Sequence, residues 1–496
     1  MASVANCSRR LLSRSSTGLV QNLPLRPQTS WLVAAGLVAA RSAAAPNSLS
    51  SPTSATSSFS TSSAARAKAV AHVRAGKQVQ VSRKKKKPMS RGKDIAPGER
   101  KAYRKRIVLS NNNALEVPGL EELAQPDATV VNAGRIMALP DAVVDQLRAI
   151  EAFKPTQNFS LFRRPSLLVR DETAELAKKL QEDVAASKKT LRVVIDGERL
   201  SGKSTMLQQV MAHGFLNDFL VFSIPECHEL TTACTEYAAI PGSDPVQYIQ
   251  ANYTLRVLKT TLAANNELLG KLKTARNHDK LANPVTAGST LRDLINSAKE
   301  PDHAWAVFSA LWSELTDAET SLPRPPVLIT VDGLAHIMRT SDYRNTAFEP
   351  IHSHDLVLVR FLVDALGGAT RFPHGAAILA ATTYGNAPKN PSLDLALAQR
   401  RVEQRATAAG EAAQLPTRDP YFRGYDDRVA AALQTVAVLQ LKGVSKTETR
   451  ALLEYWAASG VLRQRVDERA VLASWTLAGN GVVGELERTL LKSLQV

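Results

Sequence analysis

Acidic residues are missing from the first 93 residues of this 496-residue chain, although that segment holds sixteen lysines and arginines. The whole chain has 62 basic and 46 acidic residues, so the part after residue 93 carries 46 of each and is neutral. The net charge of +16 therefore belongs to the N-terminal segment, and the body is not a generally basic protein.

Cysteine and long apolar runs are also scarce. Three cysteines do not make a disulfide scaffold. Cys227 and Cys234, with His228 between them, lack an evident fourth ligand and fit no common zinc spacing, so we expect no metal centre there. The apolar run at residues 31–40 is too short to span a bilayer, and nothing else approaches a transmembrane segment. The sequence therefore predicts no membrane span.

The composition of residues 1–65 is typical of a mitochondrial transit peptide. This segment is rich in serine, alanine and arginine and free of acid. A secretory signal peptide is the alternative, but its apolar core would follow the basic residues at once rather than begin at Trp31. We therefore predict import into the mitochondrial matrix, with removal of the presequence between Phe59 and Arg74.

Residues 66–165 are expected to form a basic, extended arm that follows the surface. The run of Arg and Lys at residues 83–87 is its most basic part, and five prolines interrupt the stretch after residue 107. Such a run is compatible with a solvated linker, with a nuclear localisation signal or with contact to an RNA backbone. Mitochondrial import would exclude the nuclear alternative and leaves the other two open.

A complete phosphate-binding loop, G-x-x-x-x-G-K-S, occupies residues 197–204. The β-branched run at residues 191–196 predicts a buried strand before it, and residues 205–219 predict a helix after it. This order aims backbone N–H groups and a helix N-terminus at a polyphosphate. We expect GTP, ATP or the corresponding diphosphate to bind to Gly197, Glu198, Arg199, Leu200, Ser201, Gly202, Lys203, Ser204 and Thr205.

A magnesium site is predicted from Ser204 and Asp332 together. The apolar residues 327–331 precede Asp332, as in a buried parallel strand whose carboxyl end carries an acid. Oxygen ligands of this kind suit Mg²⁺. Thr382 and Thr383 follow the apolar residues 376–381 and are candidate contacts to the terminal phosphate.

The residue usually needed to activate water is missing, because Gly333 stands where many hydrolytic ATPases have a glutamate. Glu226 is a candidate catalytic replacement, since it ends the strand predicted at residues 219–225, which we expect to close a βαβ unit beside the loop. No Asn-Lys-x-Asp motif is present, so guanine and adenine stay open. The sequence supports nucleotide binding more firmly than turnover.

The remaining pattern predicts an α/β domain at residues 166–424 and a helical domain at residues 425–496. Helices are expected at residues 171–188, within 245–275 and at 302–319.

The order and spacing of these motifs resemble the mitochondrial ribosomal GTP-binding protein of the small-subunit head, the death-associated protein three family. The resemblance covers roughly residues 150–496 and rests on residues 197–204, on VLITVDG at 327–333 and on the strand at 375–380. It implies an AAA-like P-loop NTPase domain, with a parallel sheet and helices on both faces, followed by a C-terminal helical domain.

The same resemblance implies a bound purine nucleotide and a place in the small subunit of the mitochondrial ribosome. The implied partners are the small-subunit rRNA, other small-subunit proteins and the large subunit at an intersubunit bridge. The alternative from another class is a free mitochondrial AAA-type ATPase that remodels a substrate. That function would need a catalytic carboxylate and an arginine finger, for which Arg339, Arg360 and Arg371 are available.

Overall fold

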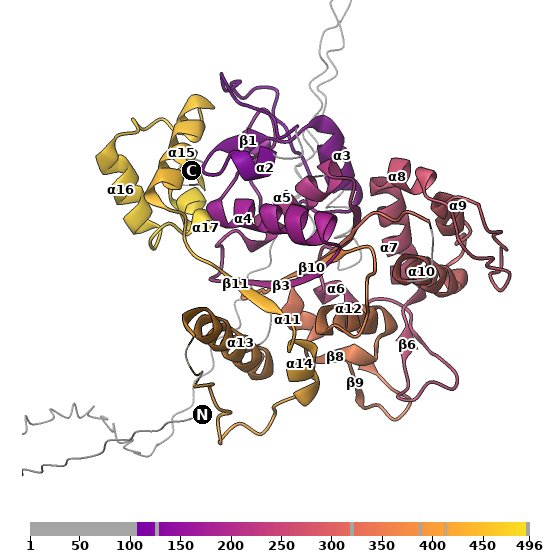
Figure 1. Cartoon of the computed structure of the whole chain (residues 1–496). Coiled ribbons are helices and arrows are strands. Elements are labelled where there is room, and N and C mark those ends of the chain that lie inside the picture. Colours follow the sequence, from indigo (N-terminus) through magenta and orange to yellow (C-terminus); the bar gives the residue numbers. More distant parts are fainter. Residues whose placement is uncertain are drawn as a thin grey trace, which may run out of the picture. The chain divides into compact units, whose positions relative to one another are not determined.

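The computed structural model describes residues 107–124, 128–317, 322–385, 389–410, 412 and 414–492 (Figure 1). The predicted transit peptide of residues 1–65, its processing region and the basic run at residues 83–87 lie outside the described residues. No helix in the described part of the chain is both long and apolar enough to cross a membrane.

Five parallel strands form the central sheet, in the order β11-β3-β10-β7-β4. Because all five run in the same direction, their carboxyl ends meet at one edge, where open α/β sheets bind ligands. The strands predicted at residues 191–196, 219–225, 327–332 and 376–381 are confirmed. The bounds are Thr190–Gly197 for β3, Leu220–Ile224 for β4, Val327–Asp332 for β7, Ala376–Ala381 for β10 and Ala437–Leu441 for β11.

The position of β4 differs from the expected one. A βαβ unit closed beside the loop would make β4 the neighbour of β3, but β10 and β7 lie between them and β4 forms an edge of the sheet. The prediction that Glu226 ends the strand beside the loop is therefore wrong. Glu226 follows β4, and β4 pairs with β7 rather than with β3. Ala381 pairs with Ile195 on one side and with Asp332 on the other, so β10 and β7 end at the same level, whereas β3 continues for two residues to Gly197.

Helices cover both faces of the sheet (Figure 1). Successive strand residues point to opposite faces, so Val193 and Ile195 enter one core whereas Val194 enters the other. This burial on both sides explains why the strands are continuous apolar runs. On the face of Val193 pack α3 (Asp141–Ala149), α4 (Asp171–Lys179) and α5 (Lys203–Leu216), and on the face of Val194 pack α10 (Pro301–Thr316) and α12 (Val357–Gly367).

Residues 128–165 are folded onto the sheet, in contrast to the extended arm expected there. Leu147, Ile150 and Phe153 are buried in the same core as α5. Pro140 precedes α3 as its N-cap, and proline is compatible with a helix start although it breaks a helix interior. The proline-rich composition therefore misled the prediction. The elements concerned are α2 (Ala128–Val131), β1 (Ile136–Ala138), α3 and a 3₁₀ turn at Phe159–Leu161, with β1 paired to β2 (Ser166–Leu168).

The segment expected to be all-helical, residues 425–496, also contributes a strand. β11 pairs with β3 and completes the sheet on that side. Its five residues are too short for the pattern to be distinguished from a buried helix turn. The helices that follow it surround a separate core that contains Trp456. They are α15 (Lys446–Ala458), α16 (Glu468–Leu477) and α17 (Val483–Glu487), continued by a π-helical stretch at Arg488–Lys492.

The helices predicted within residues 171–319 are present with shifted ends. The long predicted helix at residues 171–188 is α4 followed by a π-helical stretch, Leu180–Ala186. Residues 245–275 hold α7 (Ala251–Ala264) and α8 (Asn266–Lys271). The remaining elements are α6 (His228–Thr231), α9 (Leu291–Asn296), α11 (Leu334–Ile337), α13 (Pro391–Ala409), α14 (Asp427–Ala432), the pair β5 (Ala238–Ala239) and β6 (Tyr248–Ile249), and the pair β8 (Thr340–Arg344) and β9 (Pro350–His352).

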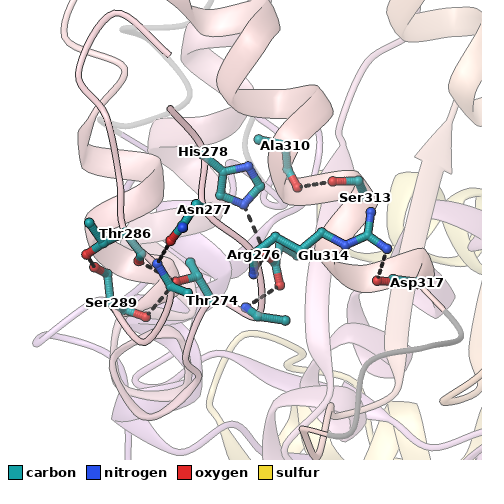
Figure 2. A network of polar contacts seen from close by, with 12 residues as sticks. Thr274, Arg276, Asn277, His278, Thr286, Ser289, Ala310, Ser313, Glu314 and Asp317 are labelled. Carbon is teal, nitrogen blue, oxygen red and sulfur yellow. Dashed lines mark hydrogen bonds and ion pairs between the residues drawn. The ribbon is translucent and has the colours of Figure 1, made fainter. Parts of the chain in front are cut away.

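A buried carboxylate on α10 holds the loop before α9 (Figure 2). Glu314 accepts hydrogen bonds from the backbone N–H groups of Ala275 and Arg276, at 2.9 and 3.0 Å. The ring of His278 lies 3.0 Å from the same carboxylate, and Arg324 forms a 2.6 Å ion pair with it. Both partners of that ion pair have side chains only 1% exposed. Glu314 therefore supplies hydrogen-bond acceptors to backbone N–H groups of a loop that has no helix or strand of its own.

Candidate nucleotide site

The loop predicted to bind phosphate connects β3 to α5 with a backbone that requires glycine at two points. Gly202 has φ +96° and is the left-handed N-cap of α5, a conformation that side chains rarely adopt. A Cβ on Gly197 would lie 2.5 Å from the carbonyl oxygen of Leu441 in β11. The close approach of β11 thus adds a packing reason to the motif's own requirement for glycine.

Lys203 is folded against the loop. Its Nζ donates to the carbonyl oxygens of Gly197 and Glu198, at 2.7 and 2.6 Å. Burial lowers the pKa of Lys203, and the nearby carboxylates of Asp196 and Asp332 oppose that shift. A phosphate oxygen is a stronger acceptor than a carbonyl for this ammonium, so the same donors can turn to a nucleotide.

Ser204 and Asp332 meet, although 128 positions separate them in the chain. The Ser204 hydroxyl donates to Oδ2 of Asp332 at 2.7 Å. A hydroxyl and a carboxylate that converge at the carboxyl ends of β3 and β7 are suitable oxygen ligands for Mg²⁺. These two residues would hold the ion, directly or through water.

Lys154 reaches the same two residues and was not predicted. Its Nζ lies 3.2 Å from the Ser204 hydroxyl and forms an ion pair with Asp332. No local motif marks it, and the segment that holds it was expected to be an extended arm. Its position becomes visible only once that segment is folded against α5.

The candidate contacts after β10 are turned toward β3. The Thr382 hydroxyl donates to Asp196 at 2.8 Å, and the Tyr384 hydroxyl donates to the same oxygen at 2.9 Å. Arg401 of α13 lies 3.4 Å from the other oxygen of that carboxylate. Burial and Asp196 together raise the pKa of Tyr384. Thr382 thus orders Asp196 in this structure, whereas Thr383 follows it half-buried.

Gly333 and Glu226 flank the end of β7. Gly333 has φ +90°, and its N–H donates to the carbonyl oxygen of Ala381 at 3.1 Å. Glu226 is half-buried, and the N–H of the following Cys227 donates to the carbonyl oxygen of Asp332 at 3.0 Å. A glutamate at position 333 would be strained by its backbone, which gives a physical reason for its absence.

Two distant segments hold the main chain of the loop. Arg170 donates to the carbonyl oxygen of Ser201 at 3.1 Å and to that of Lys442 at 2.8 Å, so it joins the loop to the end of β11. The N–H of Gly484 in α17 donates to the carbonyl oxygen of Leu200 at 3.0 Å. The C-terminal segment therefore contacts the phosphate-binding loop itself.

A cavity adjoins the loop on the side of the C-terminal helices. Aromatic rings and polar groups both line it, as in many sites for small organic ligands. Most of its lining, including the segment before β2 and α15, lies outside the phosphate-binding motif, so the motif alone does not predict the cavity. Its lining includes Ser201, Gly202 and Thr205 of the loop and first helical turn, Asn158, Phe159 and Phe162 before β2, and Tyr455 and Trp456 of α15.

Comparison with known families decides how the site is interpreted. The family model "Mitochondrial ribosomal death-associated protein 3" matches residues 167–489, which is more than half of the chain. The chain belongs to this family. Over 413 residues, the chain is 55% identical to the small ribosomal subunit protein mS29 of Neurospora crassa, a match that covers 83% of this chain and 86% of that protein. It is 25% identical to the mS29 protein of Schizosaccharomyces pombe over 339 residues, or 67% of each chain.

The death-associated protein 3 match begins at residue 167, after several residues that complete the site. Lys154, Phe159 and Phe162 all precede it, although the first contacts Ser204 and the others line the cavity. The match does include the loop, Asp332 and the C-terminal helices. The site is therefore assembled from the matched family region and from a short segment before it.

Proposed function

We propose that this chain is a component of the small subunit of the mitochondrial ribosome and serves mitochondrial translation. Family membership and the names of both relatives support this function. The acid-free, arginine-rich N-terminus supports delivery to the mitochondrial matrix. The partners are the small-subunit rRNA, other small-subunit proteins and the large subunit at an intersubunit bridge.

Within that particle, the chain binds GTP, ATP or the diphosphate through an AAA-like P-loop domain. The contact between Ser204 and Asp332, next to Lys203, is the observation that carries this proposal. Lys203 and the N–H groups at the start of α5 bind the phosphates. Ser204 and Asp332 hold Mg²⁺, which neutralises phosphate charge when bound.

The cavity beside the loop provides the place for the base. Phe159, Phe162 and Trp456 offer flat apolar surfaces, and Asn158 offers an amide able to donate and accept hydrogen bonds. Ser201 and Gly202 line the same cavity, so its walls are continuous with the phosphate-binding loop. A purine nucleotide with its phosphates on the loop would place its base between α15 and the segment before β2.

The nucleotide acts as an element of folding and assembly rather than as a fuel. A ligand that binds only the native state stabilises it by RT ln(1 + [L]/Kd), which is about 4 kcal/mol for millimolar nucleotide at micromolar affinity. Gly333, in place of a water-activating acid, supports retention over turnover. The contacts of Arg170 and Gly484 with the loop would link this stabilisation to β11 and to the C-terminal helices.

The test is the substitution Lys203→Ala, which removes the cation that faces the phosphates. We expect the purified variant to lose its nucleotide, measured by chromatography after denaturation, and to sediment less with the small subunit. Lys178→Ala is the control, because that lysine is exposed and its ammonium forms only a loose, exposed ion pair with Glu182, at 3.8 Å. Stoichiometric nucleotide in the Lys203→Ala variant would refute the assignment of the loop.

A further inference from the structure

Lys154 places an ammonium group among the residues that would hold magnesium. Its Nζ contacts both Ser204, at 3.2 Å, and Asp332, which are themselves joined by a hydrogen bond. The Asp332 side chain is 8% exposed, so its charge is largely removed from water. A buried carboxylate of this kind needs a partner of opposite charge, and Lys154 supplies it.

The main chain around Lys154 is anchored to the helix that follows the loop. Gln208 of α5 donates to the carbonyl oxygen of Ala152 at 2.6 Å, and its side chain also pairs with Gln157 at 2.9 Å. The Gln157 side chain in turn accepts from the N–H of Lys154 at 2.9 Å. Gln208 is one helical turn after Ser204, so both lie on the same face of α5.

The neighbouring side chains restrict this segment further. Phe153 is 2% exposed in the core beneath α5 and packs edge-on against Phe159, with ring centroids 5.5 Å apart. Glu151 forms a buried ion pair with Arg256 of α7. The residues on both sides of Lys154 are therefore held in place, so the fold itself positions Lys154 against Asp332.

We propose that Lys154 is an internal cation that performs part of the role of magnesium in nucleotide binding. An ammonium has three N–H donors, and the described contacts with Ser204 and Asp332 use two of them. The third is available to a phosphate oxygen of a nucleotide on the loop. Charge neutralisation at this point then comes from the chain itself, and nucleotide affinity depends weakly on Mg²⁺. This inference rests on the proposed function, because it needs a nucleotide on the loop.

The experiment measures the affinity of the full chain for fluorescent N-methylanthraniloyl GDP and ADP, with millimolar Mg²⁺ and with excess EDTA. For the wild type we expect chelation of Mg²⁺ to weaken binding by less than about threefold. For Lys154→Met we expect chelation to weaken binding by more than about tenfold, because Mg²⁺ must then replace the ammonium that contacted Ser204 and Asp332. Lys178→Met is the matched control, with the same substitution at an exposed lysine.

Each other outcome decides against the inference. A wild type that loses more than about threefold in affinity on chelation would overturn it while leaving nucleotide binding established. A Lys154→Met variant that stays insensitive to Mg²⁺ would also overturn it, because another group would then supply the charge. Absence of binding by the wild type under both conditions would reject the proposed function as well. Thermal unfolding checks that Lys154→Met is folded. If it is not, Lys154→Gln is measured in its place.

Discussion

Replacement of Glu314 by alanine should destabilise the fold strongly, through a mechanism that the structure makes explicit. The substitution leaves the guanidinium of Arg324 unpaired at a site where its side chain is 1% exposed. Removing one partner of a buried ion pair costs about 3–5 kcal/mol in the free energy of unfolding. The N–H groups of Ala275 and Arg276 also lose their acceptor, although that loop can turn to water. We therefore expect a loss of at least about 3 kcal/mol.

Urea unfolding of the wild type and of Glu314→Ala, followed by circular dichroism, measures this loss. Glu175→Ala is the control, because its 2.6 Å pair with Lys179 is largely exposed, and such surface pairs contribute about 0–1 kcal/mol. The double variant with Arg324→Met should lose less than the sum of the two single variants, since the charge that was left unpaired is gone. A loss below about 1 kcal/mol for Glu314→Ala would refute this account of the buried pair.

Two further predictions concern acid stability and turnover. Burial lowers the pKa of His354 from 6.5 to about 3, so between these values the unfolded chain binds a proton that the folded chain does not. The contribution of His354 to the free energy of unfolding is therefore complete above pH 6.5 and falls as the pH drops toward 3. The difference between the melting temperatures at pH 7 and pH 5 should be smaller for His354→Gln than for the wild type. An equal difference in the two proteins would contradict this assignment. In single-turnover assays we expect hydrolysis well below about 1 s⁻¹ in both the wild type and Glu226→Gln. Fast hydrolysis that collapses in the variant would instead indicate a free ATPase with Glu226 as its catalytic carboxylate.

The parts of the site that could be predicted are those written in contiguous residues. The loop from Gly197 to Ser204 is a local motif, because one turn of backbone must surround the phosphates. Asp332 could be predicted because a strand buried on both faces is a continuous apolar run that ends in a charge. The sheet brings the loop and Asp332 together, because the carboxyl ends of parallel strands lie at the same edge.

The parts that could not be predicted depend on contacts between distant segments. Nothing near Lys154 in the sequence shows that Gln208 anchors its main chain beside Ser204. The place of β4 at the edge depends on which strand pairs with which, a choice that the alternation of apolar residues does not encode. Thr382 is in the predicted position but faces Asp196, because side-chain direction depends on a neighbour from another strand.

The pairing of β11 with β3 has a consequence for the order of synthesis. β3 ends in the phosphate-binding loop, yet one of its two neighbours is built from residues 437–441, in the last eighth of the chain. Until those residues leave the translating ribosome or the import channel, the strand before the loop keeps an unpaired edge, which is a hazard for aggregation. A chain that ends before residue 437 would thus lack part of the scaffold of its loop and would keep this edge of β3 unpaired.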